Sequence, residues 1–384
     1  MINKYNTEAL FSKKSNKKDK ILGGIGYGLP LVSLLIVLFM IGLIISNFAL
    51  LGLPNVTWSF LTHDPKNMNT EGGIFPAIYG TFLLVLVMVV IGVPIGTMTA
   101  IYLNEYALQS SIFSKIIRFA VNTLAGVPSI VYGLFGLGFF IQTVGANIDT
   151  FKWNSLRENT VQVLTLKNAP LEGKSSSLQE ITSYLKNIDS IKFRSVNNFI
   201  QEYPNGESVK INSKDLNNFL LNKVDLKWGK PSLLWAALTL ALLTLPVVIV
   251  SVEEALRTVP KEIREASLAL GATKFETIYK IVIPSSIGGI LTGAILAVSR
   301  GAGEVAPILL TGVVYSQQSL PKSLSDQFMH LGYHLYVLAT QSPDVDKTMP
   351  IQYATTLVLI ALTLALNIIA IIIRSRIRRK TISY

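Results

Sequence analysis

The chain alternates between long apolar stretches and shorter polar ones. Six stretches carry almost no charged side chains: 21–62, 72–104, 119–148, 232–252, 284–312 and 348–373. A helix of about 20 apolar residues crosses the hydrocarbon core of a bilayer, and a helix satisfies its own backbone hydrogen bonds there. Because each stretch is long enough to do this, the pattern predicts an all-α polytopic membrane protein with six transmembrane helices.

The distribution of lysine and arginine predicts the orientation of these helices. Basic residues gather in four places: the tail 1–20, the stretch around Lys115 and Arg118, the segment 253–283 and the tail 374–384. The short loops on the other side carry few basic residues: Lys66, Lys322 and Lys347. Cytoplasmic loops of membrane proteins are enriched in Lys and Arg, so both termini and the segment 253–283 are predicted to be cytoplasmic.

The chain is therefore expected to have five parts. They are a cytoplasmic basic tail (1–20), transmembrane helices one to three (21–144), an extracytoplasmic insertion (145–231), transmembrane helices four to six with the cytoplasmic loop 253–283 (232–373), and a second basic tail (374–384).

Composition excludes several classes of protein. Hydrophobic residues make up 50% of the 384 residues and the mean hydropathy is +0.47, which is too apolar for a soluble globule of this length. The chain has no cysteine, which excludes disulfides, thiolate metal sites and a cysteine nucleophile. The net charge is +11, but the basic residues flank apolar stretches, so we expect contact with membrane lipid and no nucleic-acid partner.

The insertion 145–231 is expected to form a small α+β module. Ser177 to Glu180 has the pattern of a capping box before an amphipathic helix. Pro204-Asn205-Gly206 predicts a turn between two alternating segments, as in a hairpin.

The segment 253–283 predicts two short helices joined by a hinge. Pro260 suits a first helical turn, and Gly271 suits a left-handed cap that ends the first helix. Thr273 and Glu276 form a capping box for the second helix, which is expected to end where Pro284 removes a backbone donor. We call this predicted helix–glycine–helix unit the elbow (260–284).

The elbow carries the spacing Glu-Ala-Ser-x3-Gly-x9-Ile-x-Ile-Pro, which resembles the EAA loop of bacterial ABC importer permeases. In that family the loop docks in a groove on the ATPase subunit. The resemblance implies that coupling involves Glu265, Ala266, Ser267, Gly271, Thr273, Ile281 and Pro284. Ser267 and Ile283 depart mildly from the Ala and Leu that are usual there. A solvated charged loop is the alternative that composition alone allows.

Other stretches are similar to phosphate permeases of the PstA type: 124–136, 264–271, Leu291-Thr292-Gly293, Arg300, Gly303-Glu304 and Ala306-Pro307. The resemblance implies a MetI-like permease fold in the bacterial inner membrane and an ATP-driven importer of phosphate. It further implies a homologous second permease, an ATPase dimer and an extracytoplasmic phosphate-binding protein as partners. ATP and Mg²⁺ would be used by the ATPase, so this chain is expected to hold no cofactor and to be no enzyme. The insertion 145–231 departs from the family pattern.

Arg300 and Glu304 are the charged residues expected inside a span, where a charge usually faces a cavity or a partner. Spaced by four on a predicted helix, they can pair with each other as a structural salt bridge. The functional alternative is that Arg300 donates to an anion in the substrate path while Glu304 orients the guanidinium.

Small and helix-breaking residues predict packing seams and a possible gate. Gly289, Gly293, Ala297 and Gly301 recur every four residues, which favours close packing against another span or a second permease. Gly126, Pro128 and Ser129 in the third stretch could form a gate hinge, and a static kink is the alternative.

These patterns leave several hypotheses open. The main one is a phosphate permease; its rivals are a permease for sulfate, molybdate or phosphonate, and the other permease of a phosphate importer. An ion-driven secondary transporter with Glu304 as proton carrier is a further rival, although such proteins usually carry several intramembrane acids. His330 and His334 could hold a metal on one helical face, but an ordinary pair in an outer loop is the simpler interpretation.

Overall fold

The computed structural model describes residues 17–66, 71–108, 111–152, 154, 226–317, 319–342 and 345–382. It contains six helical segments long and apolar enough to cross a membrane: Gly28–Asn55, Phe75–Tyr106, Ser129–Lys152, Leu233–Arg257, Lys274–Gly301 and Asp346–Arg379. The prediction of an all-α membrane protein is confirmed. The capping box and hairpin predicted within the insertion lie outside the described residues.

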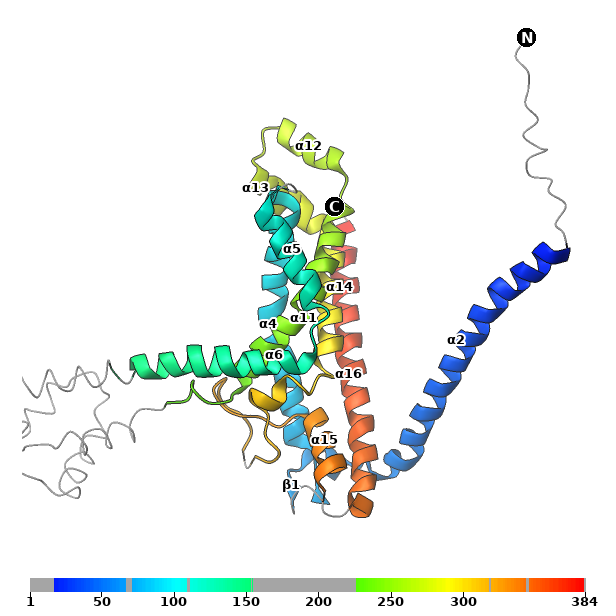
Figure 1. The fold of residues 1–384 in the computed structure, drawn as a ribbon, viewed down its shortest axis with the longest axis vertical. Helices are drawn as coiled ribbons and strands as arrows, with labels where there is room; N and C mark the ends of the chain where they lie inside the picture. The colour runs from blue at the N-terminus through cyan, green and yellow to red at the C-terminus, as the bar shows by residue number, and fades with distance from the viewer. Residues whose placement is uncertain are drawn as a thin grey trace, which may run out of the picture.

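Four helices form the main bundle: α4 (Phe75–Ile101), α11 (Leu233–Arg257), α14 (Ile283–Gly301) and α16 (Val345–Ile382). Helix α11 is the most buried of the spans, because α4, α14 and other elements cover it on several sides. Its buried residues contribute to two apolar clusters, one around Leu240 and the other around Val252. Figure 1 shows these helices running along the long axis of the molecule.

Helix α2 (Lys17–Gly52) diverges from this bundle (Figure 1). It meets α16 near its C-terminal end, where the rings of Phe48 and Tyr353 lie 5.5 Å apart. The large apolar side chains of α2 from Leu29 to Ile45 are exposed. A helix that is hydrophobic on all sides and exposed within its own chain requires an apolar environment, which the membrane provides.

The third apolar stretch is not the single span that we predicted for 119–148. It is divided between α5 (Ile112–Leu124) and α6 (Ser129–Phe135), which continues through the π-helix η3 (Gly136–Gly145) as far as Lys152. Pro128 is the residue before α6, and a proline disfavours helical geometry at the residue that precedes it. The chain turns at this break, so α6 crosses the direction of the bundle (Figure 1).

The fifth span also differs from the prediction at both ends. The second elbow helix does not end at Pro284: α13 (Lys274–Thr277) continues through the π-helix η4 (Ile278–Val282) into α14. The wider turn directly before the proline is a common way for a helix to accommodate such a residue. At the other end α14 stops at Gly301, so Glu304, which we predicted to lie within the span 284–312, lies beyond the end of the helix.

Short elements lie at the end of the bundle opposite α12 (Figure 1). They are η1 (Leu53–Asn55), α3 (Trp58–Thr62), the two-stranded ladder of β1 (Pro65–Lys66) and β2 (Glu71–Gly72), and α15 (Leu331–Gln341). The 3₁₀ turn η5 (Ile308–Leu310) follows the end of α14.

The two ends of the insertion are held together in a neck. The Trp228 carbonyl accepts a hydrogen bond from Trp235 Nε1 at 2.7 Å, and the Gly229 amide donates to Asp149 Oδ2 at 2.6 Å. Lys152 Nζ lies 5.7 Å from the centre of the Trp228 ring. The chain therefore leaves and re-enters the helical domain at one place.

The predicted small-residue seam is a contact within the chain. Gly289 faces Ala255, Gly293 faces Ser251, and Gly301 faces Met88. The spacing predicted packing either against another span or against a second permease. These contacts join α14 to α11 and α4, so the seam packs against other spans of this chain.

Replacing Gly289 with alanine should destabilise this seam. The added Cβ would lie 2.0 Å from Ala255 Cβ, so α14 would have to move away from α11. Overpacking of this kind costs about 1–3 kcal/mol. Thermal unfolding in detergent measures the effect. Gly138→Ala is the control, because its Cβ meets nothing within 4 Å; equal melting temperatures for the two variants would contradict the seam.

Candidate functional site

The elbow has the local structure that its sequence predicted. Helix α12 (Lys261–Ala269) ends before Gly271, whose φ of +87° lies in the left-handed region that favours glycine. Thr273 and Glu276 then form both hydrogen bonds of a capping box at the start of α13. The shape of the turn is thus fixed by the residues within it.

One buried contact holds the two elbow helices together. The hydroxyls of Ser267 and Thr277 lie 2.9 Å apart and are buried between α12 and α13. Ser267 therefore packs inside the elbow, and the coupling role that the resemblance implies for it stays a prediction. Alanine is usual at this position of the EAA loop, and the serine hydroxyl adds a hydrogen bond to Thr277 that alanine could not make.

The elbow carries large apolar side chains that are exposed to solvent. We call this group the elbow surface: Ile263, Leu268, Leu270, Phe275 and Tyr279. Leu270 is 89% exposed and Phe275 is 67% exposed, and Glu265 and Ala266 are exposed beside them. Exposed large apolar side chains beside charged residues, outside an apolar span, are typical of a protein interaction site.

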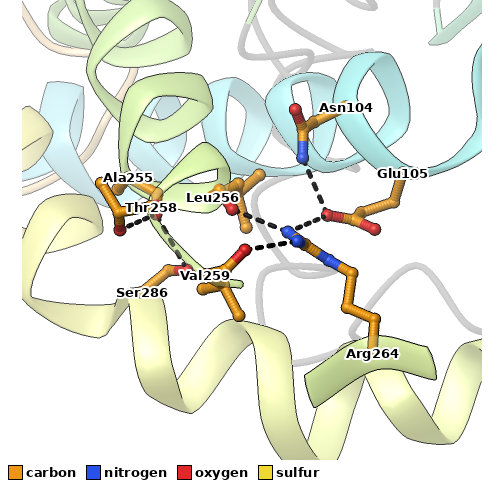
Figure 2. Close-up of polar contacts among 8 residues, drawn as sticks. All are labelled: Asn104, Glu105, Ala255, Leu256, Thr258, Val259, Arg264 and Ser286. Carbon is orange, nitrogen blue, oxygen red and sulfur yellow. Dashed lines mark hydrogen bonds and ion pairs between the residues drawn. The ribbon is translucent and has the colours of Figure 1, made fainter. Parts of the chain in front are cut away.

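Arg264 fixes the elbow to the bundle. Its guanidinium donates to the carbonyls of Leu256 and Val259 at the end of α11, and Nη2 lies 3.0 Å from Glu105 Oε1. Figure 2 shows Arg264 between these groups, with Asn104 donating to the same Glu105 oxygen. A guanidinium suits this place because it can donate to several acceptors at the C-terminal end of a helix.

A second arginine makes a similar bridge from α5. Arg118 Nη1 lies 2.9 Å from Glu253 Oε2 on α11, and Nη2 donates to the Leu103 carbonyl at 2.8 Å. Sequence reasoning missed Glu105 and Glu253 and treated Arg118 only as a marker of orientation. Their position at the ends of apolar stretches was the available signal, but it did not identify their partners.

The Arg300–Glu304 pair is formed, although not on one helix. Arg300 Nε lies 3.7 Å from Glu304 Oε1, and the two side chains are 35% and 25% exposed. This distance is longer than that of a strong charge-assisted hydrogen bond, so the guanidinium retains donors for another acceptor. Nearby on the exposed side, the Ser299 and Asn367 side chains are joined by a hydrogen bond of 2.7 Å between α14 and α16.

The break before α6 lies close to this pair. Leu124 and Val127 pack in the same cluster as Val298 and Ala302, which flank Arg300. Gly133 of α6 packs against Pro307, beyond Glu304. The structure thus brings the break that contains Gly126, Pro128 and Ser129 near the Arg300–Glu304 pair, whereas the elbow lies at the end of the bundle (Figure 1).

His330 and His334 are a buried pair, with His330 at the N-cap of α15. Among the described residues, neither nitrogen of His334 has a hydrogen-bond partner. Burial lowers the pKa of both imidazoles to about 4. In the described part of the chain, no group of three or more His, Cys, Asp or Glu side chains could hold a metal ion.

Stability should therefore fall in acid. The folded-state pKa values of His330 and His334 lie below the ordinary 6.5, so their contribution is fully present above pH 6.5 and is lost as the pH falls towards 4. The loss is on the order of 3 kcal/mol for each histidine at pH 4. His334→Leu should flatten the pH dependence of thermal unfolding, whereas His63→Gln at an exposed position should not. An unchanged profile in His334→Leu would contradict this assignment.

Comparison with known proteins identifies the family. The model of a family described as "Binding-protein-dependent transport system inner membrane component" matches residues 92–382. The chain belongs to this family. Membership, together with the six apolar helices, makes it a multi-pass protein of the bacterial inner membrane, and a transport component rather than an enzyme.

Several relatives carry names that specify a solute. The chain is 31% identical over 252 residues to the phosphate transport system permease protein PstA 1 of Mycobacterium tuberculosis H37Rv, covering 65% of this chain and 54% of the relative. It is 28% identical over 347 residues to PstA of Yersinia pestis, covering 90% and 87%. For PstA of Haemophilus influenzae the identity is 26% over 320 residues, covering 83% and 82%. The chain thus spans little more than half of the mycobacterial relative but most of the other two.

Proposed function

We propose that this chain is the PstA-type permease subunit of an ATP-driven importer of inorganic phosphate. The observation that carries the proposal is the elbow surface. It is an exposed apolar group on two helices whose geometry is fixed by Gly271, the Thr273–Glu276 capping box and Arg264. Such a surface on a member of this family is suited to binding a separate subunit.

The partner at the elbow is an ATPase dimer, which uses ATP and Mg²⁺. Helix α12, α13 and the C-terminal end of α16 lie at the same end of the bundle (Figure 1), and this end carries the basic residues of the elbow and the tail. That arrangement supports a cytoplasmic location for the elbow and the C terminus. A homologous second permease completes the path, and an extracytoplasmic binding protein delivers the solute from the opposite side.

Transport in this proposal is mechanical. ATP binding closes the ATPase dimer and moves the elbow, and the spans joined to the elbow then change their tilt. Arg300 binds the anion in the path, with Glu304 orienting the guanidinium and preventing permanent capture of the anion. Gly126, Pro128 and Ser129 act as the hinge of a gate beside this pair.

Phosphate is the proposed solute because relatives that cover most of this chain are named as phosphate transport permeases. Competition measurements test this choice. Cells that depend on this chain should take up radiolabelled phosphate, and excess phosphate should inhibit this uptake more strongly than sulfate, molybdate or a phosphonate does. A stronger effect of sulfate or molybdate than of phosphate would contradict phosphate as the solute.

A further inference from the structure

The elbow contacts a span to which it is not joined in sequence. Helix α12 follows α11, and α13 continues into α14, so the chain itself links the elbow to spans four and five. The cytoplasmic end of span two is the π-helix η2 (Tyr102–Tyr106), which follows α4. Arg264 and Glu105, which join the elbow to this end, are 159 residues apart in sequence.

Both elbow helices hold this turn. From α12, Arg264 Nη2 lies 3.0 Å from Glu105 Oε1. From α13, Lys274 Nζ lies 5.0 Å from the centre of the Tyr106 ring, which is a cation–π distance. We call these two contacts the clasp: Arg264–Glu105 and Lys274–Tyr106.

The Arg264 half of the clasp has the features of a rigid connection. The Arg264 and Glu105 side chains are only 18% and 9% exposed. The guanidinium also donates to two carbonyls of the α11 end, and the Glu105 oxygen also accepts from Asn104. Figure 2 shows these groups converging from η2, from the C-terminal end of α11 with the residues that follow it, and from α12. A planar guanidinium with several fixed acceptors permits less relative movement than one flexible ion pair.

We propose that Arg264 and Glu105 are positioning residues that make span two move together with the elbow. The clasp joins the cytoplasmic end of span two to both elbow helices. Arg264 also joins the end of span four to α12 through the Leu256 and Val259 carbonyls, and α13 continues into span five. A displacement of the elbow is thereby transmitted to three spans. Without the clasp, a displacement of the elbow is not transmitted to span two through Arg264 and Glu105. This inference rests on the proposed coupling of the elbow to an ATPase.

The ion pair of Arg257, whose guanidinium is exposed, provides a matched control. Arg257 Nη2 lies 3.6 Å from Glu253 Oε2 near the same end of α11, but the Arg257 side chain is 60% exposed. The Glu253 side chain is only 12% exposed, but a 3.6 Å pair made by an exposed arginine constrains movement weakly. Arg257→Gln therefore removes an arginine from the same region without removing a contact to span two.

Distances between spin labels test the clasp in the complete transport complex. The chain has no cysteine, so one cysteine at Lys261 on α12 and one at Met98 on the exposed side of α4 can be labelled specifically. The distance between the labels should be the same with and without a non-hydrolysable ATP analogue. It should change on nucleotide binding in Arg264→Gln but not in Arg257→Gln. If the distance between the labels changes on nucleotide binding in the protein that retains Arg264 and Glu105, the proposal is overturned.

Coupling provides the second measurement. The amount of phosphate accumulated per ATP hydrolysed should fall about tenfold or more in Arg264→Gln, because hydrogen bonds to charged groups are lost. Arg264→Lys and Glu105→Gln should retain intermediate ratios, since each keeps part of the contact, and should remain measurable if Arg264→Gln does not fold. ATPase subunits should still co-purify with all variants.

Two results would contradict the proposals, and they can be distinguished from each other. If Arg264→Gln, Arg264→Lys and Glu105→Gln all keep the ratio of the original protein, the clasp has no role in coupling while the proposed function stands. If the original protein binds no ATPase subunits, the proposed function fails and the clasp fails with it.

Discussion

Replacing Leu270 with aspartate should abolish binding of the ATPase subunits while leaving the chain folded in the membrane. Leu270 is 89% exposed, so its side chain contributes little to the fold of this chain. In the proposed complex it is buried, and burial of a leucine contributes about 1.5–3 kcal/mol. An unpaired carboxylate at a buried position adds a desolvation cost. Together these terms should weaken binding by about 100-fold or more, at about 1.4 kcal/mol for each factor of ten.

Co-purification in mild detergent measures this effect. Leu324→Asp is the control, because Leu324 is also exposed, at 42%, but precedes α15 at a distance from the elbow. The control should retain the ATPase subunits at the level of the original protein. Retention of these subunits by Leu270→Asp would show that the elbow surface is not the docking surface, whatever else the elbow does.

Replacing Arg300 with glutamine should strongly reduce phosphate uptake while the complex with the ATPase still assembles. Arg300 lies at the end of α14, far along that helix from the elbow, so the docking surface is unaffected. Its guanidinium is only loosely paired with Glu304 at 3.7 Å and can donate to an anion. Loss of a hydrogen bond between charged groups costs about 1.5–3 kcal/mol, which corresponds to a reduction in uptake of about 10- to 100-fold.

Two further variants separate the roles of this arginine. Arg300→Lys keeps the positive charge but loses the planar fork, so it should restore part of the uptake. Glu304→Gln removes the pairing charge and should reduce uptake less than Arg300→Gln does. Normal uptake in Arg300→Gln, with normal assembly, would show that Arg300 does not bind the anion. Its role would then be only the structural salt bridge with Glu304.

Much of this molecule could be predicted because its strongest signals are local. The apolar stretches predicted the six helical segments, since a span needs only sufficient length and few charges. Gly271 and the Thr273–Glu276 capping box predicted the turn of the elbow, since each acts on neighbouring backbone groups.

The features that were missed depend on contacts between distant parts of the chain. The break at Pro128 was visible as a weak point, but the path of α6 across the bundle depends on packing such as that of Gly133 against Pro307. Pro284 predicted the end of a helix, and the wide turn η4 allowed the helix to continue. The role of Glu105 was not predicted, because nothing near it in sequence indicates its contact with Arg264.

The central claim is that this chain is a passive path moved by an ATPase bound at the elbow. Reconstitution into sealed vesicles tests this claim most directly, with radiolabelled phosphate as the solute. The chain alone should accumulate no phosphate. Addition of the second permease, the ATPase subunits, the binding protein and ATP should start accumulation, and Leu270→Asp should prevent it. Accumulation by the chain alone, driven by an ion gradient and without any nucleotide-hydrolysing subunit, would contradict the account.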